Sequence, residues 1–348
     1  MEEIMAVTTS RRARWTRHFV VLCALLAPLT VTAEQPVKVQ ATQRAFNEAY
    51  RQQDWSRAIE LGLELARMVP DRPLVQYNLA CVYALGGQSE EAVHWLGRSA
   101  ASGFHNLGNL DADSDLDGIR DRPGFAGVRA AVAENQRRSE AGIRRAVVAA
   151  PPILVPPKGI DPDRPTPLII AFHGYGDRPD NYPRAWGGAA AKRGAILAVP
   201  QGVRRVGNGY FWGNVEEADA ILQLTLEQVK ERFAVDEGQI VLTGFSQGGF
   251  MAMALGLRHP ELFVGVIPIA GGYIPEIDAP TEAAIIKPRY YFIVGEDDEA
   301  AREVRLAVKD FKAAGYDVKL RILHDTGHTF PRETNRELGR ALDYVLGR

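Results

Sequence analysis

A serine within a glycine-rich segment is the residue of this chain best suited to nucleophilic chemistry. Ser246 lies in Gly244-Phe245-Ser246-Gln247-Gly248, a G-x-S-x-G pattern between an apolar run at 240–242 and a helix-like run at 250–255. A serine between a strand and a helix lies on a strained turn that exposes its hydroxyl, and small neighbours leave room for the bend. Ser246 is also the only serine after Ser139. These features favour a nucleophile over an ordinary glycine and serine turn.

A histidine near the end of the chain is the expected base. A serine hydroxyl is a weak nucleophile, so a base must take its proton during attack and return it to the leaving group. His328 follows Gly327 beyond an apolar run at 318–323. We favour it as the base over His324 and His259.

An acidic segment lies between the serine and the histidine. Asp297 and Asp298 both follow an apolar run at 290–294. An acid fixes the tautomer of the catalytic imidazole and stabilises the imidazolium, and chain position alone leaves the two aspartates open for that role. Serine, acid and histidine follow one another in the order of the α/β-hydrolase triad.

The candidate residues follow apolar runs that alternate with helix-like stretches. Strands are expected at 168–172, 196–199, 240–242, 263–269, 290–294 and 318–323, and helices at 182–192, 216–233, 250–258, 299–314 and 333–346. Such alternation predicts a mostly parallel sheet with helices on both faces. Functional groups of these sheets lie on loops beyond the carboxyl ends of strands, where all the candidates fall. Two further strands, 144–148 and 153–155, are expected before this region.

From about residue 153 to residue 346 the chain resembles the phospholipase/carboxylesterase and polyhydroxybutyrate-depolymerase-like branch of the α/β-hydrolases. The resemblance is carried by His173–Gly176, Gly244–Gly249, Gly295-x-x-Asp298 and Gly327-His328. It implies an α/β-hydrolase fold for residues 140–348. It also selects Asp298 over Asp297, because the acid of the family lies three residues after the glycine.

The resemblance further implies the reaction and the groups that bind the oxyanion. Backbone N–H groups of Tyr175 and Gln247 would hold the oxyanion of the tetrahedral intermediate. The start of a helix after Ser246 independently favours Gln247 as a donor. The implied reaction is cleavage of carboxylic esters or thioesters through an acyl-enzyme, with no metal and no cofactor. His173 is expected to be structural.

An aromatic segment at 201–214 lies on the same side of the expected sheet. We expect Trp212 to contact substrate, and packing of the aromatic side chains onto the domain is an equal alternative. The chain has no long apolar insertion of the kind that forms a lipase lid, so a modest, soluble ester is favoured over bulk lipid.

The region 34–139 shows a 34-residue spacing between related segments. Ala58 and Ala92 are 34 residues apart, and so are Ala45 and Leu79. Such a period with small residues where helices touch resembles tetratricopeptide repeats over residues 42–103. This resemblance implies an all-α domain that docks onto a neighbour or binds a protein partner.

An acidic stretch at 107–132 is expected to cap these helices. Asp113, Asp115 and Asp117 have the spacing of the first ligands of an EF-hand loop, but Gly124 stands where the loop requires glutamate. We therefore expect a solvated cap and no metal site.

The first 33 residues have the pattern of a secretory signal peptide. Several arginines precede an apolar run at 19–29, and small residues lead to an expected cleavage site after Ala33. The run is too short to span a membrane, so a periplasmic or secreted protein without stable membrane insertion is expected. Cys81 is then the single cysteine of the mature chain, and a formal charge of −2 does not indicate a nucleic-acid partner.

The sequence thus predicts an exported serine esterase with a helical repeat domain before its hydrolase domain. Two alternatives stay open. One is a peptidase of the same fold, and the other is a repeat-based binding protein that uses the hydrolase-like domain as a platform.

Overall fold

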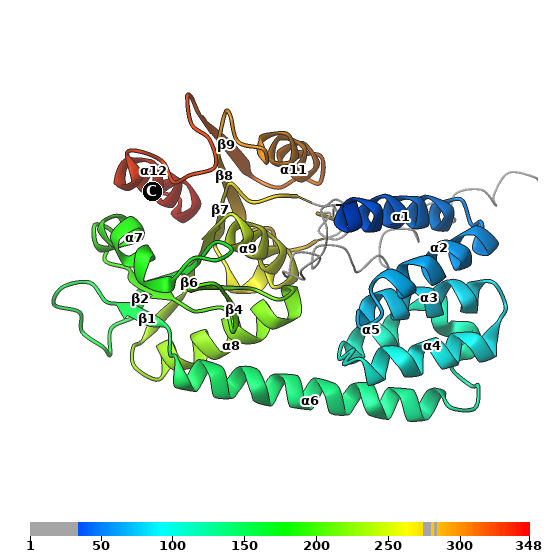
Figure 1. The fold of residues 1–348 in the computed structure, drawn as a ribbon. Coiled ribbons are helices and arrows are strands. Elements are labelled where there is room, and N and C mark those ends of the chain that lie inside the picture. The colour runs from blue at the N-terminus through cyan, green and yellow to red at the C-terminus, as the bar shows by residue number, and fades with distance from the viewer. Residues whose placement is uncertain (1–33, 274–279, 282–283) are drawn as a thin grey trace, which may run out of the picture. The chain divides into compact units, whose positions relative to one another are not determined.

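The computed structural model describes residues 34–273, 280–281 and 284–348. The expected signal peptide at 1–33 lies outside these residues. The chain divides between Gly142 and Ile143 into two compact units, a helical unit and a unit built on a sheet (Figure 1). Within the described residues, no helix combines the length and the apolar character needed to cross a membrane.

Two helical hairpins open the first unit. Its helices are α1 (Glu34–Arg51), α2 (Trp55–Met68), α3 (Pro73–Leu85) and α4 (Ser89–Ala101). The second helices of the two hairpins begin 34 residues apart, and Ala58 and Ala92 have no exposed surface. Asp54 caps α2 by accepting a hydrogen bond from the Arg57 N–H. The tetratricopeptide assignment itself stays a prediction.

The acidic stretch forms α5 (Leu107–Ala112) and the 3₁₀ helix η1 (Ser114–Ile119). The expectation of a solvated cap is wrong for Asp113, which is buried, and two carboxylates of this stretch accept hydrogen bonds from neighbouring hydroxyls. Tyr77 donates to Asp113 at 2.7 Å, and Tyr50 donates to Asp115 at 2.6 Å. Burial raises the pKa of the Tyr77 hydroxyl and of the Cys81 thiol, whose Sγ lies 3.6 Å from Asp113 Oδ2. These contacts fasten η1 onto the helical hairpins.

The long helix α6 (Phe125–Ala149) corrects one expectation. Residues 144–148 were expected to form a strand because they are rich in valine, and they are helical. Ile143 and Val147 are one helical turn apart, so both lie on one face of α6, where they join the core of the second unit. The two prolines that follow at 151–152 are compatible with the end of α6 at Ala149.

The second unit contains the expected sheet. Its seven strands have the order β1-β3-β2-β6-β7-β8-β9, and all neighbours are parallel except β1 and β3. The strands are β1 (Ile153–Val155), β2 (Thr166–Phe172), β3 (Ile196–Val199), β6 (Val235–Phe245), β7 (Gly265–Ile269), β8 (Arg289–Gly295) and β9 (Val318–Leu323). The prediction of an α/β-hydrolase fold after a helical region is confirmed.

Helices cover both faces of this sheet (Figure 1). Alternate residues of β2 enter different cores: Ile170 packs with α8, α9 and α11, and Ile169 packs with α7 and α12. These helices are α7 (Tyr182–Ala191), α8 (Val215–Lys230), α9 (Gln247–Arg258), α11 (Ala301–Ala313) and α12 (Thr334–Leu346), with short 3₁₀ turns η2 (Pro179–Asn181) and η3 (Pro260–Leu262).

A small hairpin, β4 (Arg204–Val206) and β5 (Gly209–Phe211), was not expected from the sequence. It occupies the segment 201–214. Its two-residue turn, Gly207-Asn208, has Gly207 at a φ of 55°, where glycine adopts the backbone without a steric cost.

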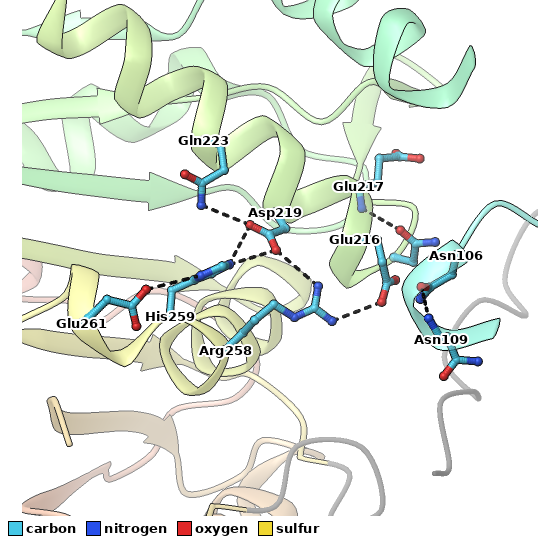
Figure 2. A network of polar contacts seen from close by, with 10 residues as sticks. Asn106, Asn109, Glu216, Glu217, Asp219, Gln223, Arg258, His259 and Glu261 are labelled. Carbon is cyan, nitrogen blue, oxygen red and sulfur yellow. Dashed lines mark hydrogen bonds and ion pairs between the residues drawn. The ribbon is translucent and has the colours of Figure 1, made fainter. Parts of the chain in front are cut away.

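A polar network joins the end of α9 to α8 (Figure 2). His259 Nε2 lies 2.9 Å from both carboxylate oxygens of Asp219, and Arg258 contacts Asp219 and Glu216. The hydrogen bond with Asp219 raises the pKa of His259 above its ordinary value. Burial opposes ionisation of Asp219, but the hydrogen bond from His259 outweighs it and leaves the pKa of Asp219 lowered. A positive charge on His259, at the C-terminus of α9, also interacts favourably with the helix dipole.

We predict that His259→Gln destabilises the protein more at pH 6 than at pH 9. The pKa of His259 is higher in the folded than in the unfolded state, so its stabilisation is complete below about 6.5 and declines as pH rises through the folded pKa. Chemical denaturation of both proteins across this pH range measures the difference. In an Asp219→Asn background the substitution should lose most of this pH dependence, and the part that stays comes from Glu261, 3.7 Å from His259 Nδ1. A pH-independent difference in the wild-type background would contradict the prediction.

We also predict that Gly248→Ala destabilises the fold. A Cβ on Gly248 would lie 2.4 Å from the carbonyl oxygen of Phe172 and 2.6 Å from that of His173, so α9 and the end of β2 would have to separate. The expected loss is about 2–3 kcal/mol by denaturant titration. The matched control is Gly187→Ala in α7, where a Cβ meets nothing within 4 Å. Because alanine favours a helix more than glycine does, this variant should be more stable than the wild type by about 0.5–1 kcal/mol. Equal stability of the two variants would refute the close contact.

Candidate active site

Ser246 lies on a sharp turn between β6 and α9. Its φ of 55° and ψ of −119° are unusual for a residue other than glycine. The turn brings Gly244 and Gly248 so close that a Cβ on Gly244 would lie 2.2 Å from the Gly248 carbonyl oxygen. The Ser246 N–H donates to the Ile269 carbonyl of β7 at 2.8 Å, which fixes the turn to the sheet.

The structure brings Ser246, His328 and Asp298 into one hydrogen-bonded chain. His328 Nε2 lies 2.8 Å from Ser246 Oγ, and His328 Nδ1 lies 2.9 and 3.0 Å from the two carboxylate oxygens of Asp298. The Asp298 side chain is buried, whereas that of His328 is 46% exposed. Such a chain can move a proton from a hydroxyl to an imidazole whose orientation a carboxylate fixes.

Asp298 is held in place by its own loop. The Ala300 N–H donates to Asp298 Oδ1 at 2.9 Å, and α11 begins directly afterwards at Ala301. The neighbouring Asp297 side chain is exposed, and it is Asp298 that accepts from His328 Nδ1. Geometry therefore separates the two aspartates that chain position leaves open.

The loops after β8 and β9 support each other and thereby His328. The Asp297 N–H donates to the Thr326 carbonyl at 3.0 Å, and a Cβ on Gly295 would lie 2.1 Å from that same oxygen. The ring of Phe245 packs against His328, with centroids 5.1 Å apart, and stacks on Phe330.

The other two histidines considered as bases lie elsewhere. His324 is 80% exposed and pairs through Nδ1 with Glu296 at 2.9 Å. His259 belongs to the polar network at the C-terminal end of α9, whereas Ser246 precedes the N-terminal end of that helix. Neither contacts Ser246.

His173 is a buried structural residue in this geometry, as expected. Its Nδ1 lies 2.8 Å from the Gly174 carbonyl, and its Nε2 accepts the Gly202 N–H at 2.9 Å. Burial lowers the pKa of His173, which agrees with a neutral ring that donates at one nitrogen and accepts at the other. His173 thereby ties the end of β2 to the segment that leads into β4.

The loop after β2 passes directly beside the serine. A Cβ on Gly174 would lie 3.6 Å from Ser246 Cβ, and the Gly174 N–H donates to the Tyr182 hydroxyl at 2.9 Å. Tyr175 follows Gly174 and is 43% exposed, and its ring lies 5.3 Å from that of Phe211. Gln247 is the first residue of α9, so its N–H has no acceptor one helical turn earlier within the helix.

The structure corrects the expectation that Trp212 contacts substrate. Its side chain has no exposed surface, its ring stacks on Phe172 at 4.3 Å, and its Nε1 donates to the His173 carbonyl at 2.7 Å. Burial of an indole with a satisfied N–H makes it part of the core. The Trp212 backbone has another role, because it exchanges two hydrogen bonds with the Gln247 side chain, at 3.1 and 2.7 Å.

Sequence reasoning missed two supports of the site. Tyr182 is buried, and its hydroxyl holds Gly174 in place. The β4–β5 hairpin packs beside the same loop through a bridge between Asp177 and Tyr210. The glycine and asparagine turn within 204–211 is the signal that could have revealed the hairpin. Nothing local marks Tyr182, because its partner is eight residues away.

Comparison with known proteins finds a family model and several relatives that are similar to part of this chain. Residues 214–346 match the Phospholipase/Carboxylesterase family. Feruloyl esterase C of Emericella nidulans is 32% identical over 134 residues, which cover 36% of this chain and 48% of the relative. A putative carboxymethylenebutenolidase of Aquifex aeolicus is 28% identical over 148 residues, with 42% and 63% covered.

Another relative is poly(3-hydroxyalkanoate) depolymerase C of Paucimonas lemoignei, 28% identical over 118 residues, with 30% of this chain and 28% of the relative covered. The chain spans less than two thirds of the length of each of these relatives. The family match at 214–346 falls within the unit that contains the seven-stranded sheet and Ser246. The second unit thus has the α/β-hydrolase fold, and residues 214–346 within it are similar to the phospholipase/carboxylesterase family.

Proposed function

We propose that the protein is a serine hydrolase that cleaves carboxylic esters or thioesters through an acyl-enzyme. The observation that carries the proposal is the hydrogen-bonded chain from Ser246 through His328 to the buried Asp298, within an α/β-hydrolase domain. We assign Ser246 as nucleophile, His328 as base and Asp298 as the acid that orients it. No cofactor or metal has a part in these steps.

In the proposed first step, Ser246 Oγ attacks the substrate carbonyl carbon while His328 Nε2 takes its proton. The tetrahedral intermediate collapses to the acyl-enzyme, and His328 returns the proton to the departing alcohol or thiol. In the second step His328 takes a proton from water, whose oxygen attacks the acyl-enzyme carbonyl carbon. As the bond to Ser246 Oγ breaks and the acid leaves, His328 returns that proton to Ser246 Oγ. Asp298 stabilises the imidazolium in both steps.

We assign the oxyanion to backbone N–H groups of Tyr175 and Gln247. Gln247 begins α9, so its N–H is at the positive end of that helix. The Gly174–Tyr175 segment also lies against Ser246, because a Cβ on Gly174 would be 3.6 Å from Ser246 Cβ. Donors fixed before the reaction stabilise developing charge without reorganisation.

The aromatic pair Tyr175 and Phe211 favours a flat or apolar acyl group beside Ser246. Tyr175 is 43% exposed and follows Gly174, which lies beside the serine, and its ring contacts Phe211 from the β4–β5 hairpin. The relative named feruloyl esterase C is consistent with an ester whose acyl part is aromatic. These two side chains replace Trp212 as the proposed substrate contacts.

The peptidase and binding-platform alternatives receive less support. The matched relatives include proteins named feruloyl esterase C and poly(3-hydroxyalkanoate) depolymerase C, and neither name is that of a peptidase. A platform for binding would not require the ordered serine, histidine and aspartate. We further propose that the chain is exported on residues 1–33 and that the helical unit binds a protein partner.

We predict that a fluorophosphonate probe modifies the folded protein and that Ser246→Ala abolishes the modification. The probe needs a serine activated by a base, because the serine oxygen displaces fluoride from phosphorus as the proton leaves. Mass spectrometry of the labelled protein locates the site. Ser139→Ala is the control and should be labelled like the wild type. Absence of label on folded wild-type protein would refute the proposed function.

We predict that Asp298→Asn lowers kcat for p-nitrophenyl ester hydrolysis by about 10⁴-fold, because the imidazole loses its orienting carboxylate. Asp297→Asn is the matched control and should change kcat by less than about threefold, since that exposed side chain does not contact His328. Steady-state kinetics across acyl chain lengths measures both variants and reports the shape of the acyl site. Equal losses in both variants would contradict the assignment of Asp298.

A further inference from the structure

The β4–β5 hairpin is hydrogen-bonded to the loop that lies beside Ser246. The Gly176 N–H donates to the Tyr210 carbonyl at 2.8 Å, and the Tyr210 N–H donates to the Asp177 carbonyl at 2.9 Å. A Cβ on Gly209 would lie 1.9 Å from the Gly176 oxygen, so the two backbones are in direct contact. The position of loop 174–177 therefore depends on the position of the hairpin.

A buried carboxylate anchors the base of this hairpin. Glu217, in the first turn of α8, has a side chain that is 5% exposed and accepts from Arg204 Nε at 2.9 Å and 3.2 Å. It also accepts the Gly213 N–H at 3.2 Å. Arg204 is the first residue of β4, and Gly213 lies two residues after β5. One carboxylate thus holds both ends of the hairpin segment against α8.

The same segment also contacts the residue that follows the serine. Trp212 lies between the hairpin and Gly213, and its backbone N–H and carbonyl bind the side-chain amide of Gln247. A shift of residues 204–213 would therefore displace Gln247 as well as loop 174–177. These are the two backbone segments to which we assign the oxyanion.

We infer that Arg204 and Glu217 are positioning residues for the oxyanion-binding backbone, acting through the β4–β5 hairpin and Trp212. The inference rests on the proposed function. Neither side chain is assigned to touch substrate; their ion pair fixes the hairpin, and the hairpin fixes the Tyr175 segment. A buried carboxylate that loses its cation is costly, so the pair resists separation. Misplacement of oxyanion donors by a fraction of an ångström weakens transition-state binding more than substrate binding.

The test compares Glu217→Gln with Glu216→Gln. Glu216 is the preceding residue of α8, and Figure 2 shows it paired with Arg258 and directed away from the Glu217 carboxylate. We expect Glu217→Gln to lower kcat for p-nitrophenyl ester hydrolysis by about 10- to 100-fold with KM nearly unchanged. The inhibition constant of phenylboronic acid, whose boron becomes tetrahedral when Ser246 Oγ adds to it and so mimics the transition state, should rise by the same factor. Glu216→Gln should behave as the wild type.

A second substitution keeps the test decisive if Glu217→Gln fails to fold. Arg204→Met removes the half-exposed partner of the ion pair and should lower kcat and weaken boronate binding as Glu217→Gln does. Arg204→Lys keeps a positive charge and should recover part of both. In all variants the pH profile of kcat/KM should keep its wild-type shape, because His328 and Asp298 are untouched.

Three results would overturn the inference. One is an unchanged kcat in folded Glu217→Gln or Arg204→Met. Another is a loss of kcat without weaker boronate binding, and the third is an equal loss in Glu216→Gln. Fluorophosphonate labelling of the wild type distinguishes failure of this inference from failure of the proposed function. An unlabelled wild type refutes the proposed function and this inference with it, whereas a labelled wild type with an unaffected Glu217→Gln variant refutes the inference alone.

Discussion

The backbone turn at Ser246 is the constraint on which the second unit depends. A positive φ at a residue other than glycine costs about 1–3 kcal/mol, so surrounding contacts must hold it. They do so through the bond from the Ser246 N–H to Ile269 and through the close approach of Gly244 and Gly248. The turn then sets two things at once. It directs Ser246 Oγ toward His328, and it starts α9 at Gln247.

Parallel strand order explains why residues far apart in the chain meet at this turn. Strands β2, β6, β7 and β8 are neighbours, so their carboxyl ends share one edge, and β9 completes it. The loops that leave this edge hold Gly174, Ser246, Asp298 and His328. Backbone contacts such as that between Gly295 and Thr326 lock these loops together, which allows a hydrogen-bonded chain between side chains 30 and 82 residues apart.

Buried polar groups outside the serine, histidine and aspartate stabilise the same edge. His173, Tyr182 and Glu217 are all buried and all bind backbone N–H groups of neighbouring loops. Buried polar side chains that are fully paired specify one arrangement, because any other arrangement leaves them unsatisfied. Because these side chains bind the loops around Ser246, they hold the backbone N–H groups of irregular segments in fixed positions.

The sequence by itself determined the sheet, its helices and the residues Ser246 and His328, because period, turn glycines and chain order are local signals. It misassigned 144–148, where valines suggest a strand but the spacing of Ile143 and Val147 suits a helix packed on a core. It left Asp297 and Asp298 open, and a family resemblance chose between them. Tertiary structure decided what depends on burial. It turns the buried Asp298 carboxylate toward His328 and places Trp212 in the core. It also pairs the buried Glu217 with Arg204 of the hairpin. Burial and pairing across loops arise only when distant segments pack, so no local pattern contains them.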